Sequence, residues 1–252
     1  MPTLSMFLIV CPLVFLAGLI DSAAGGGGLI SIPAYYAAGL PPYLASGTNK
    51  LSSSLGTTWA AIRYFRSGHL NWKVGLLAAA GAFPGSYLGA ALQQTFSERQ
   101  VHLMMLVMIP LAAVFVLTYR SDTANRLQTP ARFQAPVCIL VGLVIGFYDG
   151  LVGPGTGTFL IILFTMFLGL HPVDASGTAK IVNLASNIAA LFSYLIQGHV
   201  MILLGLPAAI FTILGAQVGS SLAIHRGARC IRHMLLIVLA LLLARMLIDV
   251  LS

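Results

Sequence analysis

The sequence predicts an all-α polytopic membrane protein with about ten helical segments, arranged as two inverted five-segment repeats that contain glycine-broken helices. Hydrophobic residues make up 58% of the 252 residues and charged residues only 8%, whereas about a quarter of an ordinary soluble domain is charged. Apolar runs close to the roughly twenty residues that cover a bilayer core recur along the whole chain. An internal repeat is the third observation, and it fixes the organisation.

The second half of the chain repeats the first. Gly18, Asp21 and Gly25 match Gly146, Asp149 and Gly153 at an offset of 128 residues. After two inserted residues, Ala-Ser-Gly-Thr-Asn-Lys at 45–50 matches Ala-Ser-Gly-Thr-Ala-Lys at 175–180, and glycines further along match at the same new offset of 130. Matches that keep one offset over long stretches indicate a duplicated unit.

Each half is predicted to contain five segments. In the first half they are 5–21, 28–39, 48–66, 73–94 and 101–119, and in the second 135–149, 156–170, 178–197, 200–223 and 232–251. Residues 1–119 form the first repeat, 120–134 a basic cytoplasmic linker, and 135–252 the second repeat. An odd number of crossings per half would turn the second copy upside down, as in many transporters.

Basic residues test that orientation because they favour cytoplasmic loops. Arg63, Arg66 and Lys73 flank a loop of the first half whose counterpart is neutral, and the second half is basic at 225–232 where the first half carries no net charge. If every segment crosses, these two basic regions and the basic linker lie on one side of the membrane, and both termini lie outside. If the second segments were re-entrant, each half would cross four times and the region 225–232 would lie on the opposite side. The charges therefore favour five crossings per half. This dispersed pattern, rather than nucleic-acid binding, explains the net charge of +7.

A glycine-rich stretch interrupts each half, at 21–28 (DSAAGGGG) and 149–157 (DGLVGPGTG). Interior glycine costs a helix about 1 kcal/mol and proline about 3, so the backbone is expected to unwind there. The next helix would begin at Leu29 or Thr158 with free amides and a positive dipole end, which suits an anion. The alternative is a tight turn outside the membrane.

Ionisable residues in membrane helices mark functional sites by default. Lys50 and Lys180 occupy equivalent positions in the two halves, as do Asp21 and Asp149. The carboxylates could pair with the lysines, cap the broken helices or take up a coupling proton; the lysines could instead extend to the surface. The predicted substrate-binding residues are Lys50, Lys180, Thr48, Asn49, Thr178, Asn183, Asn187, Gly26, Gly27, Gly28, Gly155, Thr156 and Gly157.

Motifs of enzymes and metal proteins are missing from the sequence. There is no nucleophile triad, HExxH or Walker A motif, so we expect neither an enzyme nor a bound cofactor. Cys11, Cys138 and Cys230 are far apart without CxxC spacing and are interpreted as packing residues. His69 and His199 follow glycines in short loops, which favours a turn role over a metal site.

The motifs together resemble the TauE/SafE family of sulfite and organosulfonate permeases, also called the toluene-sulfonate uptake permease family. The likeness spans essentially the whole chain and is found at 18–28 (GLIDSAAGGGG), 45–50 (ASGTNK), 146–157 (GFYDGLVGPGTG) and 175–183 (ASGTAKIVN) with Ser186 and Asn187. It implies a bacterial cytoplasmic-membrane transporter for sulfur-containing anions such as sulfite, sulfoacetate or other organosulfonates.

The expected function is therefore secondary transport of small anions by alternating access, with a proton or sodium ion as the coupling ion. The expected partners are the anion and membrane lipid, with no nucleic acid; a homodimer stays open. Two other classes remain. A metal or cation carrier would need carboxylate or sulfur ligands in the cavity, and a membrane-embedded enzyme or sulfur-relay subunit would need a reactive cysteine near the glycine-rich breaks.

Overall fold

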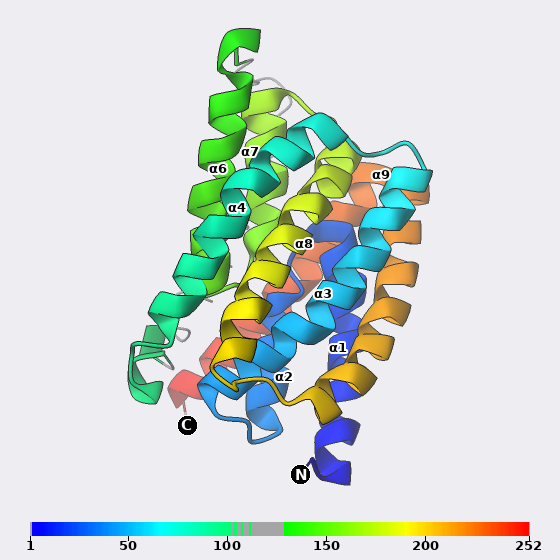
Figure 1. Ribbon diagram of the computed structural model, residues 1–252. Coiled ribbons are helices and arrows are strands. Elements are labelled where there is room, and N and C mark those ends of the chain that lie inside the picture. The colour runs from blue at the N-terminus through cyan, green and yellow to red at the C-terminus, as the bar shows by residue number, and fades with distance from the viewer. Residues whose placement is uncertain (1, 102, 105–106, 108–110, 112–128, 252) are drawn as a thin grey trace.

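The structure, a computed structural model, describes residues 2–101, 103, 104, 107, 111 and 129–251 as an all-helical chain (Figure 1). The helices of the first half are α1 (Leu4–Ala24), α2 (Gly28–Ala37), α3 (Pro42–Arg66) and α4 (Trp72–Gln93). Those of the second are α6 (Ala131–Leu151), α7 (Thr156–Leu168), α8 (Pro172–Ile196) and α9 (Ile202–Leu251). Most of the predicted fifth segment and the linker residues Arg120 and Arg126 lie outside the described residues.

Five of the described helices are long and apolar enough to cross a membrane: α1, α4, α6, α8 and the first part of α9, Ile202–Gly227. The predicted segments 200–223 and 232–251 are two helical parts of α9, separated by a sharp kink at Gly227, where the backbone is not helical. Helix α3 also has 25 residues but is much more polar, because it contains a run of serine, threonine, asparagine and lysine residues.

Helices α2 and α7 are too short to cross a bilayer core on their own. They have ten and 13 residues, about 15 and 20 Å at 1.5 Å per residue, against a hydrocarbon core of about 30 Å. Each folds back along the helix before it. Tyr35 of α2 packs with Val10 and Val14 of α1, and the backbone amide and hydroxyl of Thr129, just before α6, both donate to the carbonyl of Phe167 in α7.

This arrangement does not confirm the expectation of five full crossings per half. A hairpin returns the chain to the end from which it started, so α1 with α2, and α6 with α7, add no net crossing. Two fewer crossings per half leave the parity unchanged, so the basic regions among the described residues keep the relation to one another that the sequence predicted. Loop charges report only parity, and they could not distinguish a hairpin from two crossings.

The basic segments do gather at one end of the bundle. The end of α3 and the starts of α4 and α6 lie at the top of Figure 1, whereas both chain termini lie at the bottom. Ala223 of α9 packs with Tyr64 of α3 and Val173 of α8, which places the end of the first part of α9 at the top as well. Helix α1 therefore starts at one end of the bundle and α6 at the other.

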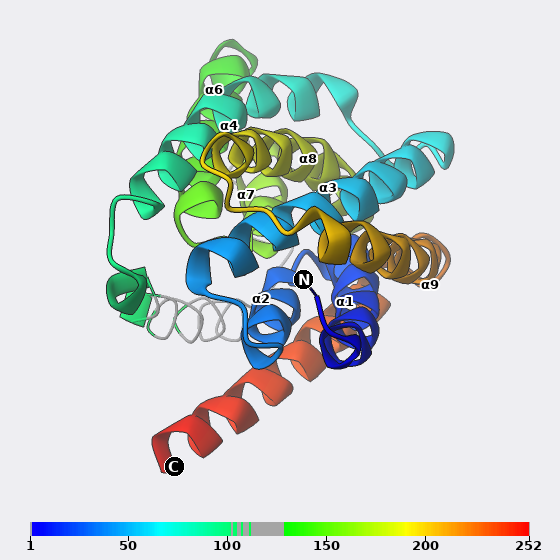
Figure 2. The ribbon, with the colours of Figure 1, turned by 60° about the horizontal axis from the view of Figure 1, so that its bottom comes forward.

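The long helices form a row whose order is α6, α4, α8, α3, α9 and α1, as seen from the end in Figure 2. The repeat pairs α6 with α1, α4 with α9 and α8 with α3. Reversing the row therefore exchanges every helix for its counterpart. Helices α3 and α8 are the central pair, so residues on their facing sides lie between the two halves.

Glycine allows the outer pairs of this row to approach closely. A Cβ atom on Gly81 of α4 would lie 2.1 Å from the carbonyl oxygen of Ile139 in α6, and one on Gly142 would lie 1.9 Å from that of Ala78. Helices α1 and α9 approach as closely, since a Cβ on Gly215 of α9 would lie 2.0 Å from the carbonyl oxygen of Phe15 in α1. Small residues are the usual means of close helix packing in lipid, where no hydrophobic force drives association.

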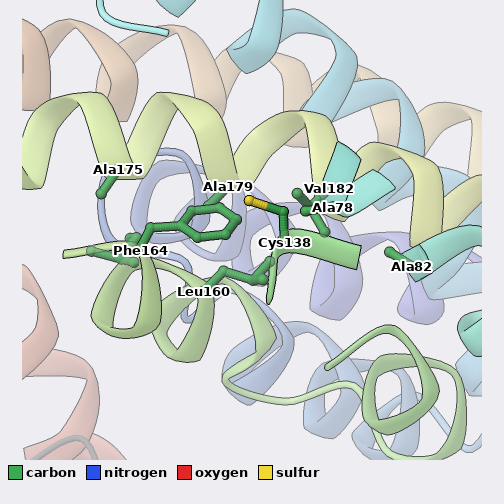
Figure 3. Close-up of a cluster of buried hydrophobic side chains, with 9 residues drawn as sticks. Ala78, Ala82, Cys138, Leu160, Phe164, Ala175, Ala179 and Val182 are labelled. Carbon is green, nitrogen blue, oxygen red and sulfur yellow. The ribbon is translucent and has the colours of Figure 1, made fainter. Parts of the chain in front are cut away.

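An apolar cluster fills the space between α4, α6, α7 and α8 (Figure 3). Cys138 lies within it beside Phe164 and Ala179, and only 1% of its surface is exposed. Cys11 of α1 is also buried. These two cysteines occupy packing positions, whereas the side chain of Cys230 lies outside the described part of the structure.

We predict that Gly81→Ala lowers the thermal unfolding midpoint of the purified protein, because the added methyl forces two backbones apart. Overpacking of this kind costs about 1–3 kcal/mol. Gly75→Ala, in the same helix, is the matched control, since its Cβ would meet only the side chain of Ile181, with the flexible end nearest. Equal midpoints for the two variants, measured in one detergent, would contradict the packing described here.

Candidate anion-binding cavity

Both predicted helix breaks are present. Helix α1 ends at Ala24, and Gly25 follows in the left-handed conformation with φ of 81°. Helix α6 ends at Leu151, and Gly153 and Gly155 have φ of 93° and 85°. Side chains other than glycine rarely adopt these angles, so the glycine clusters allow the chain to reverse inside the bundle rather than continue as one helix.

The two breaks lie against each other. A Cβ on Gly25 would be 2.3 Å from the carbonyl carbon of Gly157, and one on Gly28 would be 3.2 Å from the Cα of Pro154. The hydroxyl of Thr158 donates to the carbonyl of Ala24 over 2.9 Å. Backbone groups freed by one break are thus partly satisfied by the other, as irregular backbone at membrane depth requires.

A cavity of about 40 Å³ lies where the breaks meet α3, α8 and α9. One water molecule needs about 10–15 Å³ on this measure, so there is room for roughly three waters or one compact oxyanion. The polar side chains that line it are Asp21, Ser22, Ser31, Asn49, Lys50, Ser52, Ser53, Thr57, Asp149, Thr156, Asn183, Asn187 and Thr212. Gly25, Gly27, Gly28, Gly153 and Gly157 line it as well.

Lys50 of the first half pairs with Asp149 of the second. Its Nζ donates to Asp149 Oδ2 over 2.6 Å and to Asn187 Oδ1 over 3.0 Å. Ser186 and Thr156 donate to the same carboxylate over 2.7 and 2.9 Å. The side chains of Lys50 and Asp149 are only 6% and 7% exposed, so this ion pair is buried and hydrogen-bonded on both sides.

Lys180 of the second half pairs with Asp21 of the first, which completes an exchange between the halves. Its Nζ lies 3.0 Å from Asp21 Oδ2 and also donates to the backbone carbonyl of Asp21. The Lys180 side chain is fully buried and does not line the cavity, whereas that of Asp21 is 26% exposed. The amide of Gly27 donates to the other Asp21 oxygen over a long 3.4 Å. Asp21 is therefore the less enclosed of the two carboxylates.

These pairs change the expected electrostatics of the site. Two lysines and two aspartates sum to zero, so unpaired lysines do not make the cavity electropositive. Positive potential comes instead from the starts of α2 and α7. In the described part of the chain, the backbone amides of Gly28 and Gly157 have no acceptor, and both residues line the cavity.

Comparison with known proteins agrees with this architecture. The family described as Sulfite exporter TauE/SafE matches residues 10–246. The chain is 36% identical to a probable membrane transporter protein, ORF9, of Sinorhizobium, over 93% of this chain and 90% of that protein. It is 34% identical to the probable membrane transporter protein YfcA of Escherichia coli K12 (99% and 95%) and 32% identical to one of Haemophilus influenzae (93% and 92%). No solved structure matches.

The chain belongs to the TauE/SafE family. It is a membrane transporter of that family, and its apolar helices fit a protein that crosses the membrane several times.

Some residues predicted to bind substrate lie elsewhere in this TauE/SafE protein. Thr48 accepts a hydrogen bond from the amide of Met201, and Thr178 accepts one from the amide of Asn71, each over 3.0 Å. Neither they nor Gly26 and Gly155 line the cavity. The two threonines hold the connections 197–201 and 67–71 of the opposite half.

The glycine of each Ser-Gly-Thr motif has the same role. A Cβ on Gly47 would lie 2.0 Å from the carbonyl oxygen of His199, and one on Gly177 would lie 1.9 Å from that of His69. The motif therefore docks a loop of the other half, and only the lysine two residues after the threonine extends to the centre. A sequence pattern of this kind does not separate these two roles.

Ser186 and Thr57 are polar residues of the site that sequence reasoning missed. Ser186 donates to Asp149, and Thr57 lines the cavity and accepts from Asn187 over 3.5 Å. A signal existed for Ser186, because it lies three residues after Asn183 and therefore on the same face of α8. A signal existed for Thr57 as well, because it is the repeat counterpart of Asn187 at the offset of 130 residues.

The two loop histidines bind side chains of the opposite half. His69 Nδ1 lies 2.8 Å from Asp174 Oδ1, and His199 Nδ1 lies 2.8 Å from Gln94 Oε1. Among the described residues, no three of histidine, cysteine, aspartate and glutamate gather closely enough to hold a metal ion.

We predict that Lys50→Met and Asp149→Asn each destabilise the protein more than the double variant does. Removing one partner of a buried pair leaves an uncompensated charge and costs about 3–5 kcal/mol, whereas removing both avoids that penalty. Thermal unfolding of the four proteins in one detergent forms a double-mutant cycle, and Lys73→Met in an exposed position is the control. Additive losses would mean that the pair is not coupled.

Proposed function

We propose that this protein moves small sulfur-containing oxyanions, such as sulfite, sulfoacetate or other organosulfonates, across the bacterial cytoplasmic membrane. The observation on which this rests is the cavity where two broken helices meet between the halves. Discontinuous helices at an interface between repeats are the usual site of substrate binding in secondary transporters. The family description supports the class of substrate.

The chemistry of the cavity suits such an anion. A sulfonate or sulfite offers three acceptor oxygens with few donors. The free amides of Gly28 and Gly157 can donate to two of these oxygens, and the ammonium of Lys50 supplies a charged donor within the lining. Side-chain amides of Asn49, Asn183 and Asn187 add further donors. The volume of about 40 Å³ suits a compact anionic head group.

Transport by alternating access agrees with the arrangement of the two halves. Helices α1 and α6 start at opposite ends of the bundle, and the row of long helices maps onto itself when the halves are exchanged. Both features support two inverted repeats. Rocking one half against the other around the central pair α3 and α8 would open the cavity to one side and then to the other.

Charge balance requires a companion ion. The four buried charges cancel, so an anion bound alone would leave a net negative charge at membrane depth, where uncompensated charge is expensive. A proton on Asp21 restores neutrality. Asp21 is the better acceptor because its side chain is 26% exposed, while Asp149 accepts three side-chain hydrogen bonds. A sodium ion beside Asp21 would balance the charge equally.

The rival classes find less support. A metal or cation carrier needs free carboxylates, yet both aspartates of the cavity are paired with lysines. An enzyme or sulfur-relay subunit needs an accessible thiol, yet Cys11 and Cys138 are buried in the bundle and neither lines the cavity.

We expect proteoliposomes containing the protein to take up labelled sulfite or a small sulfonate and not divalent cations. Lys50→Gln should reduce uptake per folded protein about 10- to 100-fold, since a hydrogen bond to a charged group contributes about 1.5–3 kcal/mol. Lys73→Gln, which removes an equal charge from an exposed position, should leave uptake unchanged. Movement of cations without anions would refute the proposal.

Proton coupling predicts a separate phenotype for Asp21→Asn. The variant should still exchange internal for external anion but should no longer accumulate the anion when a pH gradient is imposed, because the amide cannot take up the proton. Parallel assays of counterflow and of gradient-driven uptake measure the two activities. Gradient-driven accumulation equal to wild type in this variant would exclude Asp21 as the proton site; a sodium requirement would identify the other coupling ion.

A further inference from the structure

A polar ladder joins α3 to α9 on the outer surface of the bundle. The indole of Trp59 donates to Gln217 Oε1 over 2.7 Å, and one turn later Arg63 Nη2 donates to Ser221 Oγ over 2.7 Å. We call the ladder and the cations at its end the basic seam. It consists of Trp59, Arg63 and Arg66 of α3 with Gln217, Ser221 and Arg226 of α9.

The seam changes from apolar to basic along its length. Trp59 is 39% exposed, and the apolar side chains of Leu214 and Val218 are exposed beside it. Arg66 and Arg226 are exposed at the end where the basic loops gather. Tryptophan followed by arginine is the order in which side chains meet the interface and the head-group layer of a bilayer.

Arg63 has unused hydrogen-bonding capacity at the centre of the seam. Its Nε is buried and has no acceptor within the described part of the chain. No carboxylate among the described residues forms an ion pair with it. A buried guanidinium N–H without a partner is costly, and guanidinium matches the geometry of a phosphate.

The repeat supplies an internal comparison. The equivalent seam, between α8 and α4 at the opposite end, has Ala189, Ser193 and Ile196 with Tyr87, Ala91 and Phe96. None of these residues is charged. Packing of the helices therefore does not require cations at these positions. The positive-inside preference accounts for cations on this side, and the buried Arg63 Nε without an acceptor is what points to a ligand.

We propose that the basic seam binds the phosphate of an anionic phospholipid, with Arg63 contacting the phosphate and the acyl chains lying against the apolar part of α3 and α9. A lipid, rather than a soluble phosphate, is the occupant because the exposed apolar surface continues directly from the arginines. Basic pockets between membrane helices on the cytoplasmic side are suited to anionic head groups.

Native mass spectrometry of the full-length protein in a neutral detergent, titrated with phosphatidylglycerol or phosphatidylcholine, tests the proposal. Phosphatidylglycerol should bind more tightly, and Arg63→Gln should weaken its binding about five-fold, since each arginine near an anionic surface contributes about 1 kcal/mol. Arg132→Gln is the matched control, because Arg132 is an exposed arginine at the same end but on α6, at the far end of the helix row.

Three outcomes would overturn the lipid site: equal binding of the two lipids, equal losses for Arg63→Gln and Arg132→Gln, or displacement of phosphatidylglycerol by inorganic phosphate at matched concentration. If Arg63→Gln fails to fold, Arg226→Gln on the partner helix takes its place with the same expected loss. Arg63→Lys keeps the positive charge but loses the planar guanidinium donors. This variant should therefore lose less affinity than Arg63→Gln, which loses both.

Discussion

A charge buried at membrane depth must find its counter-charge within the protein, and in this protein each half takes it from the other. Lys50 meets Asp149, and Lys180 meets Asp21. Each aspartate lies in the last turn of the helix that precedes a break, so the two ion pairs tie each break to the opposite half. The halves cannot separate at the centre without exposing four charges to lipid or water. The cavity therefore lies between two halves that the ion pairs hold together.

The backbone obeys the same rule as the side chains. Breaking a helix inside a membrane frees amides and carbonyls that lipid cannot satisfy. Here the breaks contact each other through Gly25 and Gly157, where a side chain on either residue would collide with the opposite backbone. Glycine ridges between the outer helices permit that approach. The amides of Gly28 and Gly157, which have no acceptor among the described residues, belong to the cavity lining, where a ligand could accept from them.

The neutrality of the buried charges connects the fold to transport. A site with unpaired lysines would hold an anion tightly and release it slowly, whereas lysines already paired bind a substrate only by competition or with a companion ion. The two ends of the bundle are not equivalent despite the repeat: one has the arginines of α3 and α9, and the other has neutral side chains. The repeat thus gives a symmetric centre, and sequence differences between the halves make the two ends of the bundle unlike in charge.

The sequence by itself determined the helical class, the two breaks, which residues of the two halves are equivalent, and that the basic groups gather at one end. These follow from local composition, from the repeat and from counting whether the number of crossings is odd or even. Only the tertiary structure decided that α2 and α7 fold back, since a hairpin and two crossings have equal parity. It also separated Lys50, which lines the cavity, from Lys180, which does not, and it assigned Thr48 and Thr178 to loop docking. These roles depend on contacts between residues about a hundred or more positions apart, which packing sets and local pattern cannot.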